Sequence, residues 1–161
     1  IQDGDDAALA GRYDRALAFY EQAISDEGLL GWSQGQLWPD SAYGAQPTPS
    51  PDPEERERLT AYALYRMMLV YALQADRAKA QSAFDQLQTE YPEGAAGQAY
   101  ARLAAAFWDS YNVRVNVAVA CKKAVQFAAA EAEAVLVPLG SDMYGSDNRG
   151  YRAQDICPFE E

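Results

Sequence analysis

Two cysteines are the residues of this chain best suited to covalent chemistry. Cys121 falls in a long alanine-rich stretch, and Cys157 lies directly before Pro158. A disulfide between them would close a loop of about 36 residues and stabilise the fold by roughly 3–4 kcal/mol in the chain-entropy model. We favour this bond, which implies an oxidising, extracytoplasmic compartment, secreted or anchored, in a bacterium. The alternative is two unlinked thiols in a cytoplasmic protein.

Catalytic chemistry is disfavoured because the chain contains no histidine. It therefore has no imidazole to serve as a general base near neutral pH or as a metal ligand. The carboxylates of Glu131 and Glu133 are two residues apart, so on a helix they point in different directions and suit a solvated face. We expect no enzymatic activity and no cofactor.

A calcium site is the remaining metal hypothesis, and it rests on oxygen-bearing residues near the C-terminus. These residues are Asp142, Asp147, Asn148 and Asp155. Their spacing does not fit the EF-hand loop, and Asp and Asn are also typical turn residues. We predict no metal site.

Composition narrows the range of partners. The 161 residues include 24 acidic and 13 basic residues, which gives a net charge of −11. Such a field repels a phosphate backbone, so nucleic-acid binding is not expected. No run of apolar residues is long enough to span a bilayer, and no membrane contact is expected from this stretch. Because the sequence begins at Ile1, we expect a fragment whose leader, anchor or further repeats lie upstream.

The elements that would carry any site are predicted to be helices. A pattern of a small, an aromatic and then a small or aliphatic residue occurs twice, at an offset of 80 − 16 = 64 residues: Ala16, Tyr20 and Ala23, then Ala80, Phe84 and Leu87. Spacings of four and three place each set on one stripe of a helix. Gly11 and Ala75 precede the two sets at the same offset. Helix pairs of this kind bury their apolar stripes by stacking.

This pattern resembles the tetratricopeptide repeat, a helix–turn–helix unit. The resemblance implies an all-α fold, a short right-handed solenoid of about three antiparallel helix pairs. It also implies a non-catalytic protein–protein interaction module that binds a protein or peptide. Two alternatives stay open: a self-capped assembly domain that forms homo-oligomers, and a small-ligand or glycan-binding domain.

We predict a single domain over residues 1–161. Its expected segments are a first pair truncated at its start (1–27), a Pro/Gly-rich loop (28–53), a second pair (54–94), a degenerate third pair (95–137) and an irregular ordered tail (138–161). Valines alternate with polar residues over 113–119, which is a strand-like period. The alanine-rich stretch that follows, without Gly or Pro before Pro138, favours a helix that starts late.

The resemblance also locates a candidate binding surface, because the first helix of each such pair lines a concave groove. The corresponding positions are aromatic or aliphatic: Tyr62, Tyr65, Leu69, Leu73, Leu103 and Phe107. Lysine and asparagine, which grip a peptide carboxylate in some members, are missing, so an apolar or extended peptide is expected. Alternatively, the chain's own tail or loop fills this groove. The loop aromatics Trp32, Trp38 and Tyr43 form a second set of contact candidates.

Overall fold

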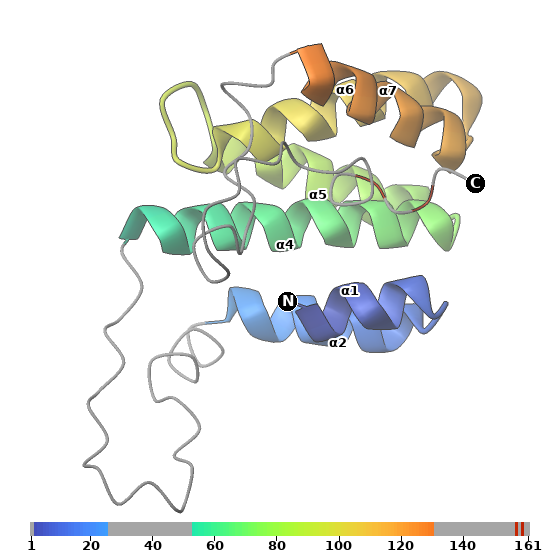
Figure 1. Ribbon diagram of the computed structural model, residues 1–161, viewed down its shortest axis with the longest axis horizontal. Helices are drawn as coiled ribbons and strands as arrows, with labels where there is room; N and C mark the ends of the chain where they lie inside the picture. The colour runs from blue at the N-terminus through green and yellow to red at the C-terminus, as the bar shows by residue number, and fades with distance from the viewer. Residues whose placement is uncertain (1, 26–52, 131–156, 158, 160–161) are drawn as a thin grey trace, which may run out of the picture.

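The computed structural model describes residues 2–25, 53–130, 157 and 159, and this part of the chain contains helices and no strand (Figure 1). The helices are α1 (Gln2–Leu9), α2 (Tyr13–Ile24), α4 (Pro53–Leu73), α5 (Arg77–Glu90), α6 (Gln98–Arg114) and α7 (Val117–Ala130). The all-α prediction is confirmed for these residues. The loop aromatics Trp32, Trp38 and Tyr43 and the tail from 138 to 156 lie outside the described residues.

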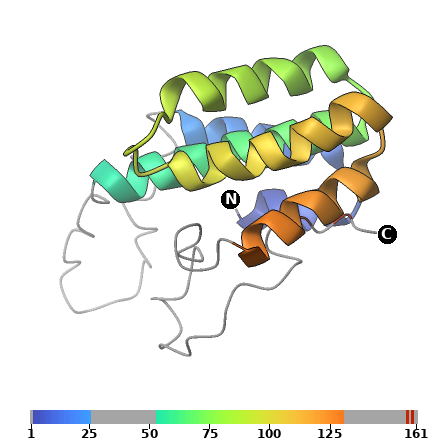
Figure 2. The same ribbon diagram turned by 90° about the horizontal axis from the view of Figure 1, so that it is seen from above.

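Helices that follow one another across a short turn pack as pairs: α1 with α2, α4 with α5, and α6 with α7. Helix α2 also contacts α4, and both α4 and α5 contact α6, so the pairs follow one another in space in chain order. The three turns within the pairs lie at the same end of the molecule, on the right in Figure 1. Figure 2 shows α6 between α5 and α7.

The first turn ends α1 with a left-handed glycine. Gly11 has φ 71°, its amide donates to the carbonyl of Ala8, and the amide of Arg12 donates to the carbonyl of Ala7. This pair of hydrogen bonds is the Schellman motif, which satisfies carbonyl groups left over at a helix end. Glycine suits the position because it adopts a positive φ without steric cost.

The second turn has the same hydrogen bonds 64 residues later. Ala75, with φ 57°, donates to the carbonyl of Ala72, and Asp76 donates to the carbonyl of Tyr71. The sequence offset between Gly11 and Ala75 therefore corresponds to two turns of one backbone conformation. In the second turn the left-handed conformation has a steric cost for alanine that glycine avoids.

The third turn is built differently. Val115 has φ 49° and its amide donates to the carbonyl of Tyr111, which is the simpler single-bond ending of a helix. The side chain of Asn116 then accepts from the amide of Val119 at 3.0 Å and caps the start of α7. The segment of alternating valines thus contains the end of α6, the turn and the start of α7. The prediction of a late-starting helix is confirmed for residues 117–130.

A fully buried alanine follows each turn at the same distance. Ala16, Ala80 and Ala120 have no exposed surface, and each amide donates to the residue four positions earlier. The small side chain allows a neighbouring helix to approach closely. Of the aromatic residues predicted to pack beside the first two, Tyr20 is fully buried and Phe84 stacks on Trp108 with ring centroids 5.2 Å apart.

The third pair begins later than the expected residue 95. Helix α6 starts at Gln98 after a turn in which Gly94 has φ 89°. A Cβ atom at Gly97 would lie 2.5 Å from the ring of Tyr91 and 2.6 Å from the Cβ of Ala61. This glycine therefore lets the start of α6 lie directly against α4.

Helix α4 occupies the centre of the described structure. It contacts α2, α5, α6 and α7, and nearly every residue from Leu59 to Ala72 is buried. The apolar character of this helix on all sides predicted this central position.

Candidate functional site

The residues predicted to line a groove come together, but they lie inside the protein. Of the six, four have no exposed surface, Tyr62 is 8% exposed and Leu73 is half-buried; the four are Tyr65, Leu69, Leu103 and Phe107. All but Leu73 belong to one core cluster that joins α4, α5, α6 and α7. The predicted face is therefore packed against other parts of the chain and is not an open groove.

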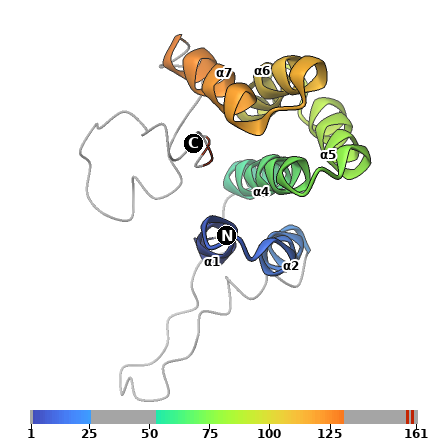
Figure 3. The ribbon, with the colours of Figure 1, turned by 90° about the vertical axis from the view of Figure 1, so that its right-hand side faces the viewer.

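Helix α7 and two C-terminal residues cover the side of α4 that an open groove would expose. Helix α7 contacts α4 as well as α6. In Figure 3, α5 and α7 lie on different sides of α4. Cys157 belongs to the core cluster, and Phe159 packs against both this cluster and the one formed with α1 and α2. Of the tail that was expected as an alternative occupant of this groove, Cys157 and Phe159 pack here, and the rest lies outside the described residues.

Aromatic side chains form much of the buried contact between α4 and α6 at this face. Tyr100 of α6 meets Tyr62 edge to face at 5.4 Å and lies 6.2 Å from Tyr65. Further along α6, Phe107 and Tyr111 stack at 5.5 Å. Offset and edge-to-face arrangements of this kind favour fixed ring positions. The rings on this face are consequently held in fixed relative positions.

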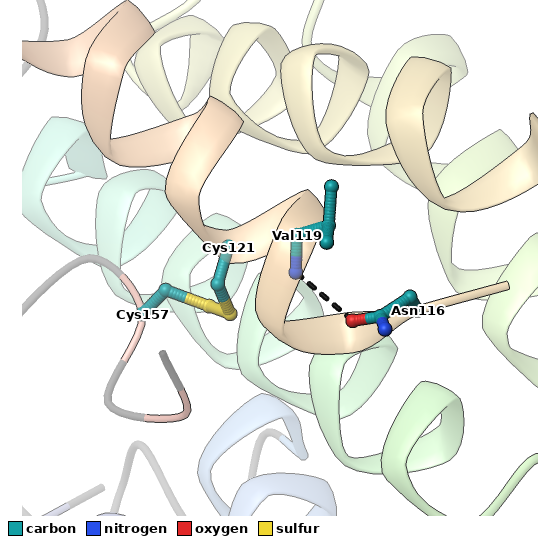
Figure 4. The surroundings of a disulfide bond; sticks show 4 residues. All are labelled: Asn116, Val119, Cys121 and Cys157. Carbon is teal, nitrogen blue, oxygen red and sulfur yellow. Dashed lines mark hydrogen bonds between the residues drawn. A yellow bond between two sulfur atoms is a disulfide. The ribbon is translucent and has the colours of Figure 1, made fainter. Parts of the chain in front are cut away.

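The two cysteines lie at disulfide distance, and their sulfur atoms are joined (Figure 4). Their Cα atoms are 5.4 Å apart, which is within the range of disulfide bonds. Cys121 is fully buried in α7 and Cys157 is 1% exposed. The predicted pairing therefore brings the C-terminal residues against the helices at the covered face.

With this geometry established, the chain can be compared with known proteins. No family model, no curated protein and no solved structure matches it. Within the described residues, no three His, Cys, Asp or Glu side chains are grouped so that they could hold a metal ion. None of the described helices is both long and apolar enough to cross a membrane.

Sequence reasoning missed a buried polar network where the first pair meets α4. Asp5 accepts hydrogen bonds from the hydroxyl of Tyr20 at 2.5 Å and from the hydroxyl of Tyr62 at 2.7 Å. The Nε of Arg66 donates to Tyr62 at 2.8 Å and lies 3.4 Å from Asp5. The network thus joins α1, α2 and α4 through charged and hydroxyl groups.

Burial gives this network an unusual electrostatic environment. Arg66 is only 5% exposed, and its guanidinium lies over the ring of Tyr62 at 5.0 Å. Burial, reinforced by the carboxylate of Asp5, raises the pKa of Tyr20 far above its ordinary value. Burial likewise raises the pKa of Tyr62, although Arg66 opposes the shift. Both hydroxyls therefore stay protonated and act as hydrogen-bond donors, and neither can serve as a base.

The sequence did carry one signal for this network. Arg66 is the single charged residue between Leu59 and Leu73. A charge in a helix that is apolar on all sides must find a buried partner, because an unpaired buried charge is very costly. The partner could not be identified from sequence, since Asp3 and Asp6 lie beside Asp5 and the neighbouring helices had no known register.

Proposed function

We propose that this chain is a non-catalytic protein–protein interaction module, a tetratricopeptide-like right-handed solenoid of a bacterial envelope protein. The supporting observation is the fully buried alanine that follows each turn, at Ala16, Ala80 and Ala120. A small residue at the same place in successive helix pairs is what a stack of repeats requires for close helix approach. The expected partner is a protein or peptide.

The partner is proposed to bind the inner face of α4, starting at its accessible edge. Leu73 is half-buried at the C-terminal end of α4, whereas Tyr65 and Leu69 are fully buried. Phe159 is partly exposed and rests on both core clusters. An apolar peptide that displaces Phe159 would gain the same contacts, so the C-terminal residues act as an internal competitor.

The cysteines support the proposed compartment. A pair at disulfide distance, with both sulfur atoms buried, supports an oxidising environment. Intact mass measured after alkylation without reductant tests this part of the proposal. Two alkylated thiols in protein isolated from its native compartment would contradict it.

The binding proposal is tested with a photo-crosslinking amino acid placed at Leu73. The matched control carries the same group at Gln81, an exposed residue on α5. We expect one partner to be crosslinked from position 73 in cells and not from position 81, and the yield to rise when the variant also carries Cys157→Ser. Equal crosslinking from both positions, or none from position 73, would contradict the proposal.

A self-capped assembly domain is the second candidate, and the covered inner face favours it. If this face is permanently closed, association must use other surfaces and involve further copies of the chain. Light scattering after size exclusion separates the two candidates. A stable dimer at micromolar concentration favours assembly, and a monomer favours the interaction module.

A further inference from the structure

The three turns within the pairs form one continuous end of the molecule, which Figure 3 views head-on. Side chains link each turn to the next. The Nε2 of Gln74 donates to Asp14 at 3.1 Å across the first and second pairs. A hydrogen bond from Arg77 to Asn112 joins the second and third pairs. These links hold the three turns side by side as one surface, which we name the turn end (residues 9–15, 74–79 and 112–116).

The turn end carries the large apolar side chains that are most exposed in the described part of the chain. Leu9 is 59% exposed, Val113 80% and Val115 56%. Val115 is the most informative, because it is a β-branched residue with φ 49°, a conformation that valine disfavours. Its side chain gains little from packing in the fold. Neither the backbone conformation nor burial therefore favours valine at position 115.

Charge distinguishes this end from the rest of an acidic chain. The turn end has two acidic residues, Asp14 and Asp76, and five basic ones: Arg12, Arg15, Arg77, Lys79 and Arg114. At the opposite end, residues 53–58 and 90–98 contain two arginines and five glutamates: Glu54, Glu55, Glu57, Glu90 and Glu93. The molecule is therefore polarised along its helices, with the positive end at the exposed apolar residues.

We propose that the turn end docks on an anionic membrane surface. The apolar tips of Leu9, Val113 and Val115 would enter the headgroup region, and the basic residues beside them would lie near lipid phosphates. The difference in side-chain charge between the two ends would orient the protein with its acidic end away from the bilayer. This inference goes beyond the proposed protein binding and differs from the expectation that the stretch makes no membrane contact.

The form of the surface favours a membrane over a protein partner. Protein hot spots are dominated by Trp, Tyr and Arg anchors that fill well-packed pockets. The turn end instead presents aliphatic side chains on the first and third turns, with basic residues near them in the sequence. Leu9 precedes Arg12, and Val113 and Val115 flank Arg114. A fluid interface accepts such separated tips without a matching shape.

Flotation with lipid vesicles tests this proposal on the whole chain. The vesicles contain either phosphatidylcholine alone or phosphatidylcholine with about one third phosphatidylglycerol, at low and high salt. We expect binding to the anionic vesicles at low salt, and its loss in neutral vesicles and at high salt. Absence of binding to anionic vesicles, or equal binding to both kinds, would overturn the proposal and leave an acidic protein as the partner for this end.

Matched variants show whether the turn end makes the contact. Val113→Ser with Val115→Asn removes two apolar tips without changing charge, and Ala129→Ser with Ala130→Ser is its control at the other end of α7. Arg114→Gln should lower the affinity about fivefold, and Arg58→Gln, which removes one charge near the opposite end, should have little effect. Because asparagine suits the conformation of Val115, the first variant should melt no lower than wild type. Equal flotation of the turn-end variants and wild type would refute the assignment.

Discussion

The Nε of Arg66, in the middle of α4, lies 3.4 Å from Oδ1 of Asp5 in α1. Both groups also share the hydroxyl of Tyr62, so the charges of two helix pairs meet at one point. Removing one partner of a buried ion pair is costly, because the other charge loses its compensation.

Asp5→Ala should therefore lower the free energy of unfolding by about 2–3 kcal/mol, less than for a fully buried pair because Asp5 is 24% exposed. Asp6→Ala is the matched control, since Asp6 is the exposed neighbour in the same helix. Urea denaturation monitored by circular dichroism measures both. Equal losses for the two variants would show that the network does not hold α1 in place.

Reduction of the disulfide should destabilise the protein by about 3 kcal/mol, because the unfolded chain regains the freedom that the bond removes. The midpoint of thermal unfolding should fall when a reductant is added. The variant Cys121→Ser with Cys157→Ser serves as control. Its midpoint of thermal unfolding should equal that of the reduced wild type and should not change when the reductant is added. A wild-type midpoint unaffected by full reduction contradicts the predicted role of the bond.

Val115→Asn should raise the free energy of unfolding by about 0.5–1 kcal/mol, because asparagine tolerates the left-handed conformation better than a β-branched residue. Val113→Asn, two residues earlier in α6, offers no such relief and should change stability by no more than about 0.5 kcal/mol in either direction. Chemical denaturation of the two variants in parallel makes the comparison. A loss of stability in Val115→Asn would mean that the valine contributes packing in the fold.

Ala80→Leu should destabilise the protein by about 1–3 kcal/mol, because the larger side chain is forced into a site with no exposed surface. Ala78→Leu makes the same change at an exposed position of the same helix and should be nearly neutral. Thermal unfolding separates the two. If both variants melt together, close helix approach at this alanine is not what holds the second pair in place.

Alkaline pH should unfold the protein through its tyrosines. Burial, with nearby glutamates, raises the pKa of Tyr91 to about 12, and burial raises the pKa of Tyr100 to about 12. Below about pH 10 these hydroxyls are protonated in both the folded and unfolded states, so the shift changes nothing. Above about pH 10 the unfolded chain ionises first, and stability falls until the folded pKa values are reached.

Urea denaturation at a series of pH values measures this loss, and phenolate absorbance of the native protein follows the ionisation. Tyr100→Phe removes one of the shifted hydroxyls and should make the decline between about pH 10 and 12 shallower. An unchanged decline in this variant would exclude Tyr100 as a contributor.

Local patterns predicted the helices well because the start and end of each helix depend on residues that are close in the sequence. Pro53 followed by acidic residues marked the start of α4, and Pro92 marked the end of α5. The packing partners depend on contacts between distant segments, which spacing does not encode. Tyr65 and Phe107 were expected to line a groove and belong to one buried cluster, and contacts of this cluster with α7 and Phe159 could be anticipated only as an alternative. Asp5 could not be chosen over its acidic neighbours without the register of α1 on α4.

The central place of α4 has a consequence for how the protein comes apart. In a linear array each unit contacts only its neighbours, so terminal units can open while the rest stays folded. In this stack α4 belongs to the middle pair, and the ion pair to α1, the contact with α7 and the buried Cys157 all involve α4 or the core around it. Opening either flank removes support from this shared helix, so its amide hydrogens should exchange with solvent last and only when the whole molecule unfolds.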